Sequence, residues 1–93
     1  MLRISEIQVS NEAAILRLEG EMSGNGVQEA RRVIEEFLRE KRRMTLDMTE
    51  LLFADRAGIA LLQELNRRQV ELINCSPFLA EQLKDTTIEG VLR

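Results

Sequence analysis

Apolar and polar residues alternate along the first part of the chain, as they do in β-strands. Residues 2–9 are rich in β-branched and apolar side chains, and their alternation slips between Ile4 and Ile7, which predicts an edge strand with a bulge. A turn at residues 10–12 separates them from residues 13–19, which alternate again. The inward positions of this second strand would be Ala14, Leu16 and Leu18. We expect the two strands to form an antiparallel hairpin.

A spacing of three and four residues, typical of an amphipathic helix, follows a glycine-rich loop. This helix should begin near Gly26, with Asn25 or Ser23 as its cap. Its inward residues would be Val27, Ala30, Ile34, Phe37, Leu38 and Lys41. On the outer face Glu35 stands four residues before Arg39, and we expect these two side chains to form an ion pair.

Shorter periodic segments fill the second half of the chain. Residues 44–48 are apolar on alternate positions and predict a buried strand. Asp55 is placed as the N-cap of a helix that runs to Arg68, and residues 70–74 predict a last strand. Ser76-Pro77 then opens a third helix, because proline is favoured at the first helical position. The inward residues of the last two helices would be Gly58, Leu61, Leu62, Leu65, Gln69, Leu79 and Leu83.

The predicted order of elements is strand, strand, helix, strand, helix, strand, helix. Strands separated by helices imply a mostly parallel sheet with right-handed crossovers. A chain of 93 residues has the usual size of one domain. We therefore predict a single α/β domain over residues 1–93. Its small, mixed, mostly parallel sheet would have about four strands, with an antiparallel hairpin at the N-terminus and three to four helices.

Charge and composition exclude several kinds of function. The 13 basic and 16 acidic side chains give a formal charge of −3, which provides no electrostatic surface for nucleic acid or an anionic membrane. The chain lacks histidine, which excludes a histidine-based triad and a histidine metal cluster. It has no tryptophan or tyrosine and only three phenylalanines, which argues against binding by aromatic stacking of bases or sugars. Cys75 is the only cysteine, which excludes an intrachain disulfide or a cysteine zinc site.

No apolar stretch is long enough to cross a bilayer, and the N-terminus has no basic and apolar leader. We therefore expect a cytoplasmic protein that binds no nucleic acid, does not insert into a membrane and uses no cofactor, metal ion or catalytic residue. One enzymatic alternative stays open, because Asp47 and Glu21 end strands and Asp55 follows, so that Asp47 and Asp55 could share a metal ion. Helix capping and hydrogen bonds to loop amides explain the same carboxylates more simply.

Three segments carry a resemblance to a known family. Residues 46–62 form an apolar strand ending in Asp47, a short connector, and then Asp55-Arg56-Ala57-Gly58 before an apolar helix. Residues 18–22, Leu-Glu-Gly-Glu-Met, and Cys75-Ser76-Pro77 provide two further matches in the same order. Together they resemble the STAS domain, the module of bacterial anti-sigma-factor antagonists and of some anion transporters.

The resemblance implies a non-enzymatic module in which the Asp55–Gly58 turn and the following helix dock onto a partner, typically a kinase-like anti-sigma factor. In switching members of the family, the partner phosphorylates a serine or threonine directly before the glycine. Ala57 occupies that position here, so the usual phosphoacceptor is missing. The family's acidic residue in the first loop is also replaced, by Ser23.

The predicted docking surface combines the turn with the outward face of the helix that follows it. Its residues would be Asp55, Arg56, Ala57, Gly58, Ala60, Gln63, Glu64 and Arg67. Arg56 places a fixed positive charge where the family usually has a small polar residue, so an acidic patch on the partner is the expected complement.

Other functions stay open beside this one. A STAS subunit of an ABC-type lipid or toluene-tolerance transport system would bind the ATPase of that system, and alanine before the glycine is acceptable there too. The protein could also act through a homodimer formed along the first strand. Thr49 and Ser23 are minor candidates for modification in place of Ala57.

Overall fold

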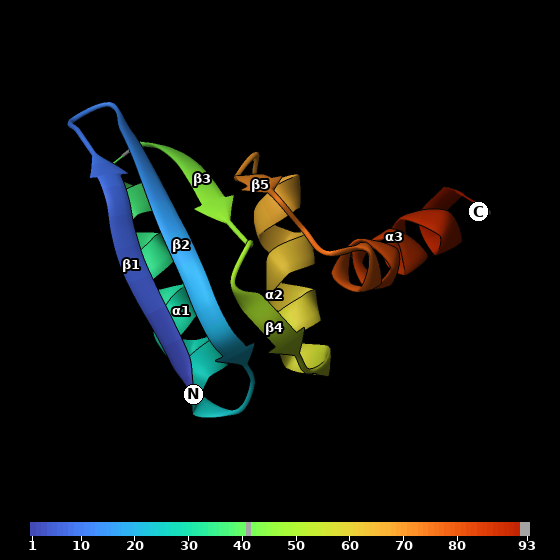
Figure 1. Ribbon diagram of the computed structural model, residues 1–93. Coiled ribbons are helices and arrows are strands. Elements are labelled where there is room, and N and C mark those ends of the chain that lie inside the picture. Colours follow the sequence, from blue (N-terminus) through green and yellow to red (C-terminus); the bar gives the residue numbers. More distant parts are fainter. Residues whose placement is uncertain (41, 92–93) are drawn as a thin grey trace.

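The computed structural model describes the backbone of residues 1–40 and 42–91, and the side chains of these residues as far as Lys84. Within that part the chain forms a mixed five-stranded sheet and three helices (Figure 1). In chain order the elements are β1 (Leu2–Val9), β2 (Ala13–Met22), α1 (Asn25–Arg39), β3 (Arg43–Asp47), β4 (Leu51–Ala54), α2 (Arg56–Arg67), β5 (Glu71–Ile73) and α3 (Pro77–Val91). The predicted fold class is therefore confirmed, with one strand more than expected.

The sheet has the order β1-β2-β3-β5, and β4 also pairs with β2. The β1–β2 hairpin is antiparallel, whereas β3, β4 and β5 pair in parallel with their neighbours. The register of the hairpin shifts between Glu6 and Gln8, so the predicted bulge is present at Ile7. As predicted, β1 lies at the edge of the sheet.

The extra strand, β4, arises because β2 continues past its predicted end at Glu19. The first part of β2 pairs with β3 as far as Arg17, and residues Gly20 to Met22 of β2 then pair with β4. Gly20 makes this continuation possible, because it has a φ of 96° and a Cβ there would run into the carbonyl oxygen of Met1. Consequently β3 and β4 follow one another along the same side of β2 (Figure 1).

The helices α1 and α2 lie side by side over one face of the sheet (Figure 1). The core between helices and sheet consists of Ala14, Leu16, Leu18, Met22, Val27, Ala30, Ile34, Met44, Leu46, Met48, Leu51, Ala54, Leu61, Leu62, Leu65, Val70 and Leu79. Most of the inward positions predicted for both helices are confirmed by this set. Leu83 and Cys75 pack partly buried against it, and burial raises the pKa of the Cys75 thiol.

Two details of the helices differ from the sequence predictions. Gln69 is not on the inner face of α2, because the helix ends at Arg67 and Gln69 is exposed with a φ of 72°. Among the described residues no side chain caps α1, whose N-cap is Gly24 rather than Asn25 or Ser23. The prediction for Lys41 lies outside the described residues.

Candidate functional site

The predicted docking turn, residues 55–58, opens α2 directly after β4. The Oδ1 atom of Asp55 accepts a hydrogen bond from the backbone N–H of Gly58 at 2.8 Å, which confirms Asp55 as the N-cap. Its Oδ2 atom accepts from the N–H of Gly24 at 3.2 Å. These two donors lower the pKa of the Asp55 carboxyl, so the group stays ionised near neutral pH. One carboxylate thus joins the start of α2 to the loop that precedes α1.

Gly58 allows this turn to lie directly against the sheet. A Cβ at this position would run into the carbonyl oxygen of Met22 and would lie 3.2 Å from the Cβ of Ala54. The N–H of Asp55 donates to the same Met22 oxygen at 3.1 Å. The close approach of backbone to backbone therefore explains why glycine occupies position 58.

The two residues between Asp55 and Gly58 face outward. Arg56 and Ala57 are both exposed. Within the part of the chain that the structure describes, the side chain of Arg56 forms no hydrogen bond and no ion pair. Ala60 and Arg67, further along α2, are exposed as well. These four side chains are therefore placed where a partner can reach them.

Gln63 and Glu64, by contrast, form hydrogen bonds with neighbouring helices. The Nε2 atom of Gln63 donates to the backbone oxygen of Leu83 at 3.1 Å, which joins α2 to α3. The carboxylate of Glu64 accepts two hydrogen bonds from Arg31 on α1, at 2.9 and 3.0 Å. The exposed surface of α2 is accordingly narrower than the sequence suggested.

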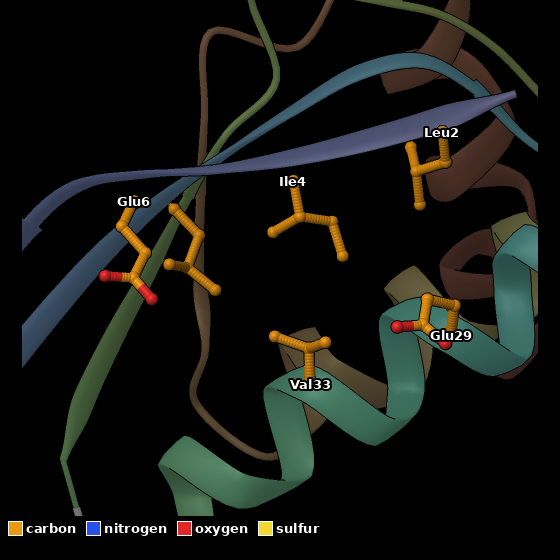
Figure 2. A pocket seen from close by; sticks show the side chains of 6 residues that line it. Leu2, Ile4, Glu6, Glu29 and Val33 are labelled. Atoms are coloured by element: carbon orange, nitrogen blue, oxygen red, sulfur yellow. The ribbon is translucent and has the colours of Figure 1, made fainter.

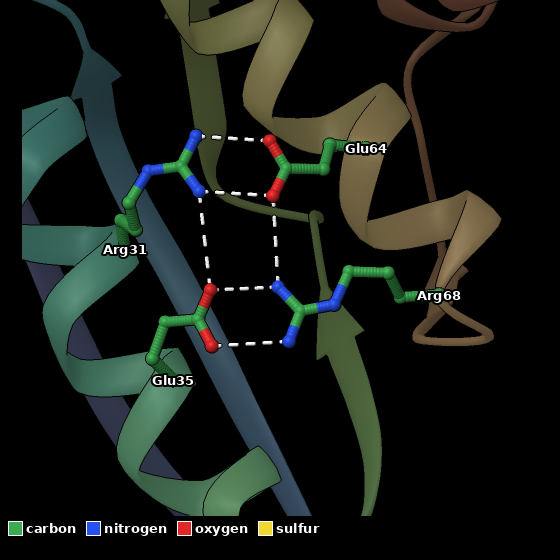
Figure 3. Close-up of polar contacts among 4 residues, drawn as sticks. All are labelled: Arg31, Glu35, Glu64 and Arg68. Atoms are coloured by element: carbon green, nitrogen blue, oxygen red, sulfur yellow. Dashed lines mark hydrogen bonds and ion pairs between the residues drawn. The ribbon is translucent and has the colours of Figure 1, made fainter.

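Four charged side chains form a closed ring between α1 and α2, here called the ion-pair ring: Arg31, Glu35, Glu64 and Arg68 (Figure 3). Arg68 donates to Glu35 at 2.6 and 3.0 Å, so Glu35 does not form the predicted pair with Arg39. Hydrogen bonds with the arginines lower the pKa values of Glu35 and Glu64. The ring joins the side chains of α1 to those at the carboxyl-terminal end of α2. The ring is not predictable from helical spacing, because two of its ion pairs join residues of different helices.

Asp47, the other carboxylate with possible chemistry, ends β3 and joins it to β2 and to the segments that follow β3 and β5. Its Oδ1 atom accepts from the N–H and hydroxyl of Thr49 at 3.0 and 2.6 Å and from Asn74 at 3.2 Å. Its Oδ2 atom accepts from the Nε and Nη2 atoms of Arg17 at 3.3 and 3.2 Å. The hydrogen bonds from Thr49, followed by those from Asn74 and Arg17, hold the pKa of this carboxyl far below its usual range, although burial opposes them.

The carboxylates considered for a shared metal ion therefore have separate sets of donors. Asp47 is bound by side chains of β2 and of two connecting segments, and Asp55 by backbone N–H groups. Glu21 is exposed, with Oε1 3.6 Å from the amino group of Met1. The described residues include no group of three or more acidic, histidine or cysteine side chains arranged to hold a metal ion.

An apolar pair lies beside the docking turn and was not among the predicted site residues. Leu52 is 78% exposed and Phe53 is 45% exposed, and both lie on β4 between the buried residues Leu51 and Ala54. A signal was present in the sequence, since four consecutive apolar residues in so short a segment cannot all face one core. We call Leu52 and Phe53 the β4 pair.

A cavity of about 330 Å³ lies between β1 and α1 (Figure 2). Its lining residues are Leu2, Ile4, Glu6, Leu16, Glu29 and Val33. Figure 2 shows Ile4 above Val33, with Glu6 and Glu29 on opposite sides. None of the predicted site residues lines this cavity.

Comparison with known proteins connects this geometry to a family. A family model for the STAS domain matches residues 5–92. The chain belongs to the STAS domain family. This STAS chain is also similar to a solved structure described as the anti-sigma factor antagonist SpoIIAA in its unphosphorylated form. The TM-score is 0.67 at 21% sequence identity, over 96% of this chain and 97% of that chain.

At that identity the similarity to SpoIIAA shows a shared STAS fold. No curated protein matches this STAS chain. No helix in the described part of it has both the length and the apolar character needed to cross a bilayer.

Proposed function

We propose that this STAS protein binds a regulatory protein partner, without catalysis, through the docking turn and the amino-terminal end of α2. The observation that carries the proposal is the division of roles inside the turn. Asp55 and Gly58 are used to hold the turn against the sheet, whereas Arg56 and Ala57 project outward. A rigid turn with outward side chains suits docking, because little conformational entropy is lost on binding.

The partner class follows from the family. The fold is shared with an anti-sigma factor antagonist, which supports a kinase-like anti-sigma factor as the partner and a role in transcription regulation within the bacterial cytoplasm. The ATPase of an ABC-type lipid or toluene-tolerance transport system is the alternative partner. Both are proteins, so the same surface can be tested against either.

Binding by this route would not be controlled by phosphorylation at the family position. A phosphate adds nearly two negative charges to a docking surface, which is how it releases a partner. The methyl group of Ala57 cannot accept a phosphate, and Arg56 adds a positive charge beside it. Control of binding would therefore come from partner concentration or from another site.

Calorimetric titration against purified partners tests the proposal. Each anti-sigma factor kinase and each ABC ATPase encoded in the same genome would be titrated with the wild-type chain and with Arg56→Glu. We expect one partner to bind, and the charge reversal to weaken its binding at least about tenfold, as reversal of a charge in an interface does. Arg39→Glu makes the same change on the exposed carboxyl-terminal end of α1 and should leave the affinity unchanged.

The outcomes separate the two partner classes. Binding of a kinase supports the antagonist role, and binding of an ATPase supports the transport role. Equal affinities for wild type, Arg56→Glu and Arg39→Glu would contradict the assignment of the surface. Failure of every candidate to bind would contradict the proposed function itself.

A further inference from the structure

The docking turn alone is too small to support a stable complex. Stable protein interfaces bury roughly 800 Å² on each partner, and most of the binding energy comes from a few large side chains near the centre. The exposed residues at the amino end of α2 include Ala57 and Ala60, which have little apolar surface. Gln63 and Glu64 are already bound to α3 and α1. Large apolar contacts must therefore come from a neighbouring element.

The β4 pair provides such contacts immediately before the turn. Successive side chains of a strand point to opposite faces, so one of two adjacent apolar residues would normally be buried. Here the ladder with β2 matches Gly20 to Leu51 and Glu21 to Phe53, and it skips Leu52. Leu52 points away from the core because Leu51 before it is buried, and the skipped position makes Phe53 point outward as well, opposite the exposed Glu21. Irregularities of this kind often redirect a side chain next to a functional site.

The surface around the β4 pair is continuous with the docking turn. Ala54 and Asp55 connect the two in the chain, and the N–H of Asp55 donates to Met22 of the adjacent strand. The Asp55 carboxylate also accepts a hydrogen bond from the N–H of Gly24, which places the loop before α1 beside the docking turn. Of the strands that the structure describes, only β2 pairs with β4, so the other edge of β4 is not covered by the sheet.

We infer that Leu52 and Phe53 form the apolar centre of the docking surface, and that they fit a partner protein that presents an apolar recess with a carboxylate beside it. The recess matches the two exposed apolar side chains, and the carboxylate matches Arg56, which has no intramolecular partner among the described residues. This inference rests on the proposed function, because it names the partner chemistry of the same surface.

Single substitutions in the full chain test the inference. Leu52→Ser and Phe53→Ser would each be titrated against the kinase or ATPase that binds the wild-type chain. We expect each to weaken binding at least tenfold, while far-UV circular dichroism stays unchanged because both side chains are exposed. Ile7→Ser is the matched control, since Ile7 is an apolar residue of similar exposure, 46%, on the edge strand β1. Its affinity should change less than twofold.

The possible results lead to different conclusions. If Arg56→Glu weakens binding but both serine variants bind like the wild type, the proposed function stands and this inference is wrong. If Ile7→Ser weakens binding more than they do, the apolar centre lies on β1. If light scattering finds a dimer that Leu52→Ser dissociates, the surface is occupied by a second copy. If no candidate binds the wild-type chain, the proposed function fails and this inference fails with it.

Discussion

The two ends of α2 are used in different ways. At the amino end, the Asp55 carboxylate caps the helix and Gly58 lies directly against the backbone of the sheet, and the side chains between them are exposed. In the second half of the helix, side chains make the contacts. Gln63 binds α3, and Glu64 belongs to the ion-pair ring with α1. The amino end therefore leaves the side chains of Arg56 and Ala57 exposed, whereas in the second half of the helix the outward side chains of Gln63 and Glu64 are bound to other helices.

Helical periodicity alone therefore does not tell which outward residues of α2 are available to a partner. Helical spacing places one outward face on α2, made of Arg56, Ala60, Gln63, Glu64 and Arg67. The face is real, but its carboxyl-terminal half is partly covered by neighbouring helices. Outward on an isolated helix is therefore not the same as available in the fold. Substitutions at Gly58, Asp47 and Glu35 test how much each of these contacts contributes to stability.

Gly58→Val should have the largest effect on stability. The valine side chain would meet the Met22 carbonyl and the Ala54 methyl group, so we expect a loss of about 3 kcal/mol in the free energy of unfolding. Urea denaturation followed by far-UV circular dichroism measures it, because the chain has no tryptophan or tyrosine. Ala57→Val is the control one residue earlier, on the exposed side, and should cost less than about 1 kcal/mol. Equal effects of the two changes would contradict the close packing of the turn.

Asp47→Asn should have the next largest effect, because this carboxylate fixes the connector that leads into β4. Asp47 is only 8% exposed. The loss of charged hydrogen bonds from Arg17 and Thr49 should lower the free energy of unfolding by about 2 kcal/mol at neutral pH. Glu50→Gln removes an exposed carboxylate nearby and should change stability by less than about 0.5 kcal/mol.

The pH dependence of the stability of the wild type and of Asp47→Asn gives a second test. The pKa of Asp47 is lower in the folded than in the unfolded chain, so its contribution is complete above the unfolded value of about 4. Below that pH the unfolded chain takes up the proton first, and the contribution is lost as the pH falls towards the folded value. The difference in stability between wild type and Asp47→Asn should therefore narrow below about pH 4. A difference that stays constant down to pH 2 would contradict this role.

Glu35→Gln should have the smallest effect. It opens the ion-pair ring at a partly exposed position, where such pairs contribute only about 0.5 kcal/mol. The loss should shrink in 1 M salt, because screening weakens the pairs. Glu36→Gln changes the adjacent, exposed glutamate and is the control. If Glu36→Gln costs as much as Glu35→Gln at low salt, the ring does not stabilise the fold.

Much of the fold could be predicted from the sequence because it depends on local patterns. Alternation gave the hairpin and the bulge near Ile7, and the three- and four-residue spacing gave the inner faces of α1 and α2. The strand β4 was missed for a physical reason. Its four residues are all apolar, so they show no alternation, and its pairing depends on Gly20 continuing a strand through a positive φ.

The local contacts of the candidate site could be predicted from the sequence, but its contacts with distant parts of the chain could not. Asp55 as a cap and Gly58 as a close contact follow from residues near one another in the chain. The hydrogen bond from Gly24 to Asp55 and the engagement of Glu64 by Arg31 join residues more than thirty positions apart. Contacts at such separation depend on how the helices lie over the sheet, which helical and strand periodicity does not specify.

The most direct test of the account is to map the partner's contact surface on the wild-type chain. Amide chemical shifts of the labelled protein would be recorded with and without the kinase or ATPase that binds it. We predict that the largest changes fall in residues 23–25 and 52–58, with smaller changes beyond Ala60. Changes concentrated along β1, or around Gln63 and Glu64 at the opposite half of α2, would contradict the assignment of the docking surface.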